Sequence, residues 1–563
     1  ATMKSSGLTH ITQFVELCAQ AGLRNVVLSP GSRNAPLTIA FEANGRIKTY
    51  LVHDERSAAF FAMGLSESLN QAVAICCTSG SAVLNYAPAI AEAYYRQIPL
   101  FVVTADRPPE LIDQGDGQTI RQKNVFSNFV KSEYELPAVP SGEASDGSNR
   151  IATECLNTLM NGVLGPVHLN VPLYEPLYLL DDETSAISFE RIEVSSEGLV
   201  ESQKEQISAE WERYGRRMIL IGQQSSFETV PDSLRQLISD PSVAVLVENT
   251  SNVQDFGQIC HCIDRTLAGI SDDEIEQFQP ELLITIGGAI ISKRIKSFFR
   301  QHPPKVHWRV GEYHFEEDCF QVLTESFQVK QSVFFDHLLS VHEPAVSTFG
   351  NFWKQRDFET KEKHFNTVER APFSDLKAFE IILSSIPENS NVLMGNSSAV
   401  RYCQLFDPVR SLNYFSNRGV SGIDGCSSTA VGMTNGNDHL HTLISGDISF
   451  FYDSNAWWND YLNDRLRIIV INNGGGGIFE YIPGPSSSGN LEKFVAPHSG
   501  DISRLCAAFD LEYMLASTTE ELEEIFQSFY TQSSNGKPKV LEVNTRNSDN
   551  AGILQSYFQS LAK

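Results

Sequence analysis

The chain has 563 residues, of which 42% are hydrophobic and 20% charged, and its formal net charge is −26. At roughly 100–200 residues per domain, this length predicts about two to four domains, each with its own hydrophobic core. The negative charge argues against nucleic acid or an anionic membrane surface as a partner, although a local cluster of arginines can still favour an anionic small substrate.

Membrane and secretory signals are missing from the sequence. No apolar run approaches the ~20 residues that span a bilayer, and the N-terminal region has no basic-then-apolar signal pattern. The ten cysteines are scattered, and Cys260, His261 and Cys262 lack the spacing of a zinc site. We therefore expect a cytoplasmic protein with reduced, buried thiols and no membrane span.

The first third of the chain alternates short β-branched runs with polar turns and helical patterns. The predicted strands are 26–28, 50–52, 72–77 and 100–104. A helical pattern at 58–69 follows the second of them. This alternation predicts a parallel sheet with helices on both faces.

The same alternation restarts twice along the chain. The later predicted strands are 218–221, 243–247 and 282–286, then 392–394, 440–445, 467–471 and 540–543. Polar, acidic stretches separate the three sets. We therefore predict an α/β fold of three doubly wound domains with mainly parallel sheets flanked by helices, covering residues 1–182, 205–345 and 365–563.

Polar residues follow two strands of the last set. Gly446 and Asp447 stand at the end of strand 440–445, and 24 residues separate Asp447 from Asn472. Those residues contain an aromatic stretch predicted as a helix over 450–462 and the strand 467–471. Because the parallel strands of one βαβ unit end at the same edge of a sheet, Asp447 and Asn473 are expected to converge there.

The chemistry of this edge suits a metal bound to a diphosphate. Mg²⁺ prefers oxygen ligands and commonly combines one or two side chains with phosphate oxygens. Asp447 offers a carboxylate and Asn473 an amide oxygen. The glycines 474–477 allow a backbone carbonyl to turn toward the ion, and the helix after Asp447 directs free N–H groups at a diphosphate.

A Gly-Asp pair, a gap of this length and then Asn-Asn resemble the cofactor motif of thiamine-diphosphate-dependent enzymes. The alternative is a turn and an Asn-rich loop in an unrelated α/β protein. The resemblance implies the thiamine-diphosphate-binding fold, with a pyrimidine-binding domain first, a Rossmann-like domain in the centre and a diphosphate-binding domain last. It also implies cofactor contacts at Glu55, Ser397, Ile423, Gly446, Asp447, Ser449, Asn473 and Gly475.

The resemblance gives Glu55 a catalytic role. In this superfamily a glutamate hydrogen-bonds the aminopyrimidine ring, favouring the imino tautomer whose nitrogen removes the thiazolium C2 proton. Such a carboxyl shares a proton in an apolar site, where burial raises its pKa. The alternative is that Glu55, which precedes the helical pattern, is an exposed carboxylate favoured by the helix dipole.

Further motifs narrow the resemblance to one branch. They are SPGSR at 29–33, HDER at 53–56, TSGSA at 78–82, TADRPPEL at 104–111, SNRG at 416–419, GIDG at 422–425 and IF at 478–479. They are similar to those of the 2-succinyl-5-enolpyruvyl-6-hydroxy-3-cyclohexene-1-carboxylate synthases of menaquinone biosynthesis. The similarity covers both outer domains, whereas in the middle it rests mainly on SKR at 292–294.

This branch implies a transferase reaction of the carboligase type. 2-Oxoglutarate loses CO₂ on the cofactor, and the resulting succinic-semialdehyde carbanion adds to isochorismate. Both substrates are dicarboxylates, which arginine binds in a bidentate way. The implied cofactors are thiamine diphosphate and Mg²⁺, with Mn²⁺ as the alternative ion, and the implied assembly is a homodimer or homotetramer with sites at the subunit interface.

The resemblance also transfers the substrate and metal contacts. The substrate contacts are Ser32, Arg33, Arg107, Gln118, Lys293, Arg294, Ser397, Arg401, Arg418, Ile478 and Phe479. The metal ligands are Asp447, Asn473 and the carbonyl of Gly475, and Ile423 is the apolar prop under the cofactor. Gly117, Gly474 and Gly477 depart from the branch, where amide side chains are common, so contacts from those positions are in doubt.

Other functions remain open from the sequence. An acetolactate synthase or a 2-oxo-acid decarboxylase shares the superfamily but does not need so many cations at the strand ends. A regulatory nucleotide-binding protein would need a G-x-G-x-x-G turn after a strand, and no such arrangement occurs. A catalytically inactive scaffold of the same fold is disfavoured, because Glu55, Asp447 and Asn473 are all present.

Overall fold

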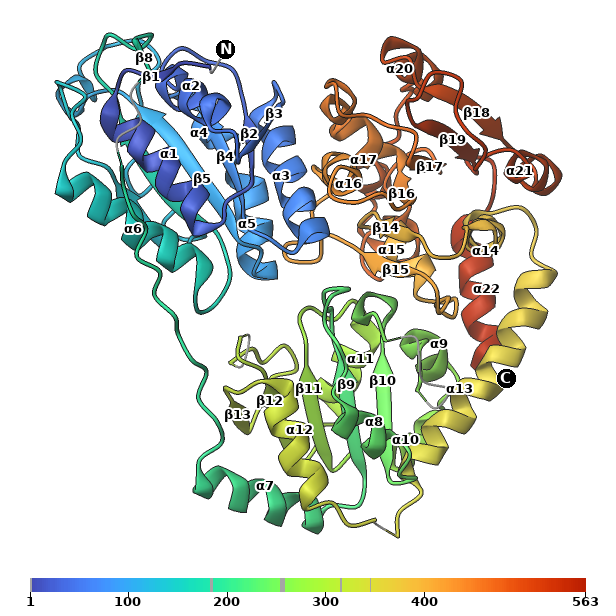
Figure 1. The fold of residues 1–563 in the computed structure, drawn as a ribbon. Helices are drawn as coiled ribbons and strands as arrows, with labels where there is room; N and C mark the ends of the chain where they lie inside the picture. The colour runs from blue at the N-terminus through green and yellow to red at the C-terminus, as the bar shows by residue number, and fades with distance from the viewer. Residues whose placement is uncertain (1–2, 183–185, 254–258, 314–315, 345, 563) are drawn as a thin grey trace.

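The computed structural model describes residues 3–562 except 183–185, 254–258, 314–315 and 345. Three parallel sheets organise these residues, as the sequence predicted. Figure 1 shows the first and last sheets with their helices side by side, and the middle sheet below them. Among the described helices, none is long and apolar enough to cross a membrane.

The first sheet has six parallel strands in the order β3-β2-β4-β5-β7-β6. Its strands are β2 (Asn25–Leu28), β3 (Lys48–Leu51), β4 (Val73–Cys77), β5 (Leu100–Asp106), β6 (Ser132–Glu135) and β7 (Val167–Pro172). Its helices are α1 (Thr9–Ala21), α2 (Ala35–Ala43), α3 (Glu55–Leu69), α4 (Ser81–Leu84), α5 (Ala87–Arg96) and α6 (Asp146–Met160). A short antiparallel pair joins β1 (Ser5–Ser6) to β8 (Leu180–Asp181).

The middle sheet has five parallel strands in the order β10-β9-β11-β12-β13. They are β9 (Arg217–Ile221), β10 (Val243–Val247), β11 (Leu282–Ile286), β12 (Val306–Val310) and β13 (Glu325–Phe327). The helices are α7 (Glu201–Arg213), α8 (Asp232–Ile238), α9 (Ile263–Ala268), α10 (Ile275–Phe278), α11 (Lys293–Gln301) and α12 (Gln331–Ser340). The long helix α13 (Phe349–Glu369) then runs from the middle unit, beside α9 and α10, up to α22 (Asn550–Ala562) of the last unit (Figure 1).

The last sheet repeats the topology of the first, in the order β15-β14-β16-β17-β19-β18. Its strands are β14 (Asn391–Met394), β15 (Asn413–Phe415), β16 (His441–Gly446), β17 (Leu466–Asn472), β18 (Glu512–Ala516) and β19 (Lys539–Asn544). Its helices are α14 (Asp375–Ser385), α15 (Ser398–Cys403), α16 (Cys426–Thr434), α17 (Asp447–Tyr452), α18 (Ile478–Tyr481), α19 (Leu491–Val495), α20 (Ile502–Ala508), α21 (Thr519–Phe526) and α22 (Asn550–Ala562). In both outer sheets the strand order changes direction beside the first strand, and ligands of α/β sheets bind at such a point.

One predicted helix is shorter than expected. The aromatic stretch 450–462 forms only the end of α17 and a 3-10 turn at Ser454–Trp457. Asp453 ends the helix because its buried carboxylate accepts the backbone N–H of Ser428, at 2.6 Å, and the Ser428 hydroxyl. This long-range contact outweighs the helical propensity of the stretch.

The outer sheets share one apolar core. Buried side chains from both sheets form a continuous cluster around α3 and α16, while α1, α2 and α6 cover the other face of the first sheet. The two helices approach closely through glycine: a Cβ on Gly64 would lie 2.1 Å from the Thr429 carbonyl oxygen, and one on Gly432 would lie 2.0 Å from that of Phe61. Any larger residue at either position would therefore force the helices apart.

We expect Gly432→Ala to destabilise the α3–α16 contact by about 1–3 kcal/mol, because its methyl group cannot fit without backbone movement. Thermal unfolding followed by circular dichroism measures the effect as a lower melting temperature. Gly45→Ala is the matched control, since a Cβ there meets nothing within 4 Å. Equal melting temperatures for the two variants would show that the helices can separate at no cost.

Candidate active site

The metal–diphosphate edge forms where β16 and β17 end. The two strands pair in parallel with Gly446 opposite Ile471, so Asp447 and Asn473 emerge side by side. Asp447 is buried at the start of α17, and burial raises the pKa of its carboxyl while His498 opposes the increase. A Cβ on Gly446 would meet nothing within 4 Å, so the edge beside Asp447 is open. The predicted convergence is therefore present in the structure.

The amide of Asn473 has a fixed orientation. Its Nδ2 donates a hydrogen bond to Asp375 Oδ2 at 3.1 Å. Its Oδ1 is buried and has no hydrogen-bond partner among the described residues. Burial raises the pKa of Asp375 to about 6, and the charge of Asp447 adds to the increase, which places all three groups together. An unpaired buried oxygen next to a carboxylate suits a hard cation.

The glycine loop contains the third predicted metal ligand, the carbonyl of Gly475. Gly475 has φ 159 and a Cβ there would lie 2.4 Å from the Val495 carbonyl oxygen, so this close approach requires glycine. The carbonyl of Gly475 accepts the N–H of Gly477 at 3.0 Å and keeps a second lone pair. A Cβ on Gly477 would lie 2.6 Å from Asn473 Nδ2, so an amide side chain there would disturb the Asn473 side chain.

These donors fit Mg²⁺ bound to a diphosphate. They are one carboxylate, one amide oxygen and one backbone carbonyl, and the described residues contain no cluster of three or more His, Cys, Asp or Glu side chains arranged for a metal. Mg²⁺ accepts such a mixed oxygen set when phosphate and water complete the octahedron. His498, whose Nε2 lies 2.5 Å from Asp447 Oδ2, was not predicted from the sequence.

The other predicted cofactor residues surround the same edge. Ser449 Oγ donates to the carbonyl of Ile423 at 2.8 Å, which fixes the predicted apolar prop against α17. Ser397 precedes α15 with φ 69, at the end of β14, which pairs with β16. Ile478 is buried at the start of α18, and the Phe479 ring lies 5.9 Å from that of Phe494. These side chains come from consecutive strand ends of the last sheet.

One group of predicted cations borders this edge. Burial lowers the pKa of Lys293, and the charges of Arg401 and Arg418 add to the decrease, so the three cations lie near one another. Arg418 is 9% exposed and donates to Asn396 Oδ1 at 3.0 Å. Arg294 is exposed and lies 4.2 Å over the ring of Phe558, on α22. Lys293 and Arg294 come from the middle sheet, Arg401 and Arg418 from the last.

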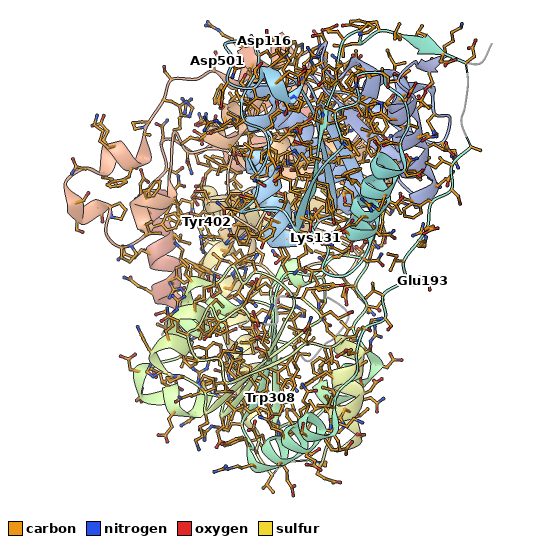
Figure 2. All side chains as sticks on the ribbon, turned by 90° about the vertical axis from the view of Figure 1, so that its left-hand side faces the viewer. Asp116, Lys131, Glu193, Trp308, Tyr402 and Asp501 are labelled. Carbon is orange, nitrogen blue, oxygen red and sulfur yellow. The ribbon has the colours of Figure 1, made fainter. Side chains whose placement is uncertain are left out.

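A second group of predicted cations lies on the first sheet. Arg33 is 3% exposed and donates to the carbonyl of Leu173 at 2.9 Å, and burial and the charge of Arg107 lower its pKa. Arg107 pairs with Asp116 at 3.3 Å. Figure 2 separates Asp116 clearly from Tyr402, the residue after Arg401. Arg107, which pairs with Asp116, therefore lies on a different part of the chain from the helix that carries Arg401 and Tyr402.

Two uncharged predicted substrate contacts, Ser32 and Gln118, also come from the first unit. Both are exposed. Gln118 has φ 56 and donates through Nε2 to the Thr78 hydroxyl at 3.2 Å. A Cβ on Gly117 would meet nothing within 4 Å, so the structure leaves room for the amide side chain that the position lacks.

Glu55 occupies the first turn of α3. Asp54 caps this helix by accepting the N–H of Arg56 at 2.9 Å, so Glu55 is free of a capping role. The Glu55 side chain is partly buried, and burial raises the pKa of its carboxyl. A carboxyl of this kind can share a proton with a ring nitrogen.

A further positioning residue was missed from the sequence. Glu92 is 1% exposed on α5, and its carboxylate accepts the N–H groups of Gly419, at 2.7 Å, and Val420, at 3.0 Å. It thereby fixes the loop that carries Arg418. The only sequence signal was the Glu92–Arg96 spacing, which is also typical of a solvated helix face.

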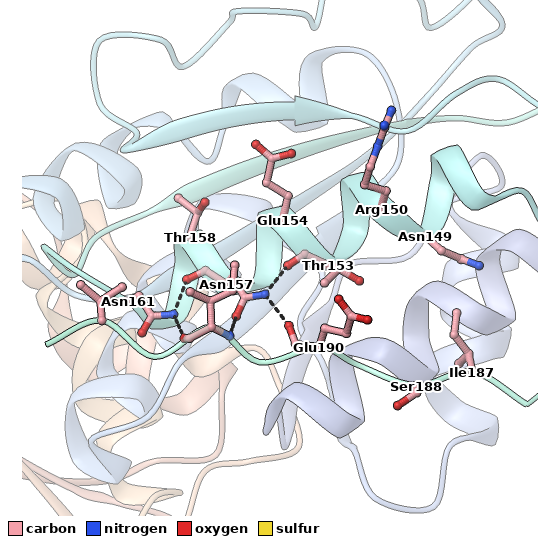
Figure 3. A pocket seen from close by; sticks show the side chains of 12 residues that line it. Asn149, Arg150, Thr153, Glu154, Asn157, Thr158, Asn161, Ile187, Ser188 and Glu190 are labelled. Carbon is pink, nitrogen blue, oxygen red and sulfur yellow. Dashed lines mark hydrogen bonds between the residues drawn. The ribbon is translucent and has the colours of Figure 1, made fainter.

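A surface hollow of about 580 Å³ lies elsewhere, between α6 and the segment 187–194 (Figure 3). Asn157 donates there to the carbonyls of Thr153 and Glu190, and Asn161 to that of Ile192. None of the predicted site residues lines it. Its hydrogen bonds attach the connection toward the middle sheet to the first unit, so we assign it a structural role.

Comparisons with known proteins agree with this geometry. Residues 9–125 match the family model described as "Thiamine pyrophosphate enzyme, N-terminal TPP binding domain". The chain is 41% identical to a 2-succinyl-5-enolpyruvyl-6-hydroxy-3-cyclohexene-1-carboxylate synthase of Christiangramia forsetii, with 99% of each chain covered. It is 40% identical to the protein of the same name from Porphyromonas gingivalis, covering 97% of this chain and 96% of the relative.

A solved structure supports the fold. It is described as a thiamin diphosphate-dependent enzyme from Mycobacterium smegmatis, and it matches with a TM-score of 0.71 over 96% of this chain and 99% of its own. The sequence identity is 16%, so this likeness bears on the architecture alone.

We expect Asp375→Ala to weaken Mg²⁺ binding by about 10–100-fold, because Asn473 loses the partner that orients its amide. Calorimetric titration of Mg²⁺ in the presence of thiamine diphosphate measures this without turnover. The matched control is Glu542→Gln, since Glu542 accepts from the neighbouring Asn472 at 3.0 Å. Equal affinity in the Asp375 variant and the wild type would show that Asn473 needs no such support.

Proposed function

This chain belongs to the family of the thiamine-diphosphate-dependent 2-succinyl-5-enolpyruvyl-6-hydroxy-3-cyclohexene-1-carboxylate synthases, and on this basis we propose its substrates and the roles of its site residues. The substrates are 2-oxoglutarate, which loses CO₂, and isochorismate, which receives the remaining four-carbon unit. The reaction is a carboligation in menaquinone biosynthesis.

The observation that carries this proposal is the pairing of the metal edge with a cation group. Asp447 and Asn473 end β16 and β17, while Ser397 and Arg401 follow β14 in the same sheet. Burial lowers the pKa of Lys293, and Arg401 and Arg418 lie close enough to lower it further; burial and the charge of Arg401 also lower the pKa of Arg418. Cations kept together at this energetic cost are best explained by an anionic ligand that relieves their repulsion. A small uncharged or monoanionic substrate would not need them.

Thiamine diphosphate, when bound, supplies the nucleophilic carbon and accepts the electrons released with CO₂. Asp447, Asn473 and the Gly475 carbonyl would hold Mg²⁺ beside its diphosphate. Glu55 would share a proton with the aminopyrimidine ring, a role that its raised pKa favours. The two cation groups bind substrate carboxylates, and Ile478 and Phe479 exclude water from the reacting atoms.

Three finer features belong to the same proposal. The ion is Mg²⁺, with Mn²⁺ as a substitute of similar geometry. The assembly is a homodimer or homotetramer, and its sites combine the first sheet of one chain with the last sheet of another. The separation of Asp116, the partner of Arg107, from Tyr402, the residue after Arg401, supports this arrangement (Figure 2). The location is the cytoplasm, where ten cysteines, all free thiols, are stable.

The substrate assignment predicts a preference among 2-oxo acids. With thiamine diphosphate and Mg²⁺, CO₂ release from 2-oxoglutarate should exceed that from pyruvate by at least about tenfold, because the distal carboxylate needs a cationic partner. Isochorismate should accelerate turnover. A coupled CO₂ assay measures both effects. A preference for pyruvate would assign the chain to an acetolactate-synthase or decarboxylase activity instead.

The shared site predicts complementation between two inactive variants. Glu55→Gln and Asp447→Ala should each be inactive alone. After subunit exchange, about half of the dimers are mixed, and each mixed dimer carries one intact site and one with both defects. About a quarter of wild-type activity should therefore return.

Each variant incubated alone serves as the control for this experiment, and mass spectrometry confirms that the subunits exchange. If exchange occurs and no activity returns, Glu55 and Asp447 of one site come from the same chain.

A further inference from the structure

Glu248 is a buried carboxylate that the mechanism does not use. It follows β10 in the middle sheet and is 2% exposed. Its Oε1 accepts the N–H of Ile291 at 2.7 Å, and its Oε2 accepts the N–H of Ser292 at 2.9 Å. These two residues immediately precede Lys293 and Arg294, the first residues of α11. The carboxylate therefore holds the two residues that lead into α11.

Three further contacts fix the same corner, which we define as residues 291–294. Ser292 Oγ accepts the N–H of Ile295 at 3.0 Å and donates to Asp264 Oδ1. Arg401 Nη1 donates to the carbonyl of Ile291 at 3.3 Å. The corner thus lies between the middle sheet and the cation group of the last sheet.

Glu248 is itself fixed from both sides. Its N–H donates to Ser251 Oγ at 3.0 Å, and that hydroxyl donates to the carbonyl of Ile221 at 2.7 Å. The adjacent Asn249 accepts a hydrogen bond from Gln404 at 2.6 Å, one residue beyond the helix that carries Arg401. Any shift of Glu248 would therefore move the corner relative to Arg401.

Burying this carboxylate costs free energy of desolvation, so a role for it in the structure is expected. Burial raises the pKa of Glu248 to about 7, and the two N–H groups and the charge of Arg418 oppose the increase. A glutamine or an apolar residue would avoid this cost, but neither offers two acceptor oxygens to two adjacent N–H groups.

We propose that Glu248 is a positioning residue for substrate binding: by accepting the N–H groups of Ile291 and Ser292, it holds the corner so that Lys293 joins Arg401 and Arg418 around a substrate carboxylate. This inference rests on the proposed function, since it takes these cations to bind the substrate.

The test is a double-mutant cycle between Glu248→Gln and Lys293→Ala. Glu248→Gln keeps the size of the side chain but presents an NH₂ group to one of the two N–H donors. The Lys293→Ala variant identifies the substrate that this cation contacts, because the KM of that substrate rises. Glu248→Gln should raise the KM of the same substrate by about tenfold, while kcat stays within about threefold of the wild type. In the double variant the two effects should not add, because Glu248 acts through the position of Lys293.

The matched control is Asp240→Asn. Asp240 is a buried carboxylate at the other end of the same strand, where it accepts the N–H of Ser242 at 2.7 Å. We expect this variant to lower the melting temperature without changing either KM. A KM that is unchanged in Glu248→Gln, or KM effects that add independently, would overturn the positioning role.

Hydrogen exchange separates this role from the proposed function. The amides of Ile291 and Ser292 should exchange at least about tenfold faster in Glu248→Gln than in the wild type or Asp240→Asn. If the wild type does not turn over 2-oxoglutarate, the substrate assignment fails. The exchange experiment tests separately whether Glu248 anchors the corner: unchanged exchange in Glu248→Gln would refute the anchoring, and faster exchange confined to the corner would support it, whatever the substrate.

Discussion

The packing of α3 against α16 determines how the first and last sheets lie relative to each other. Gly64 and Gly432 let the two helices approach until backbone meets backbone, and apolar side chains from both sheets close around them. Close-packed interiors transmit displacement rather than absorb it. The loops at the ends of both sheets are therefore held by a rigid core. A small displacement of α3 against α16 would also displace Glu55, which lies at one end of α3.

Buried carboxylates perform the same task for the loops themselves. Glu92, Glu248 and Asp375 each hydrogen-bond a segment that carries a predicted substrate or metal contact. A carboxylate in a poorly solvated interior interacts strongly with N–H donors, and the loss of one partner leaves the other unsatisfied. Such an anchor gives a loop one well-defined position, which a site that must place several charges precisely in space requires.

Cations are grouped at two places although the protein as a whole is negatively charged. The chain carries a net charge of −26, yet Arg33 and Arg107 form one cation pair, and Lys293, Arg401 and Arg418 form a second cation group. Burial and mutual repulsion lower the pKa of Arg33, Lys293 and Arg418, so the folded chain alone pays a cost for them. A dicarboxylate bound there, as we propose, would remove that repulsion and so link ligand binding to local stability.

The sequence alone determined eleven strands of the three sheets, the parallel α/β class and the convergence of Asp447 with Asn473, because these depend on local periodicity and on the rule that parallel strands end at one edge. Of the described strands in these three sheets, it missed β6, β7, β12, β13, β15 and β18. It did not predict the early end of α17 at Asp453, the contact of His498 with Asp447, or the roles of Glu92, Glu248 and Asp375. It also could not show that Arg294 lies over Phe558 or that Arg401 donates to the carbonyl of Ile291. Each of these depends on residues far apart in the chain, so only the packing of the three sheets and their helices decides which groups meet.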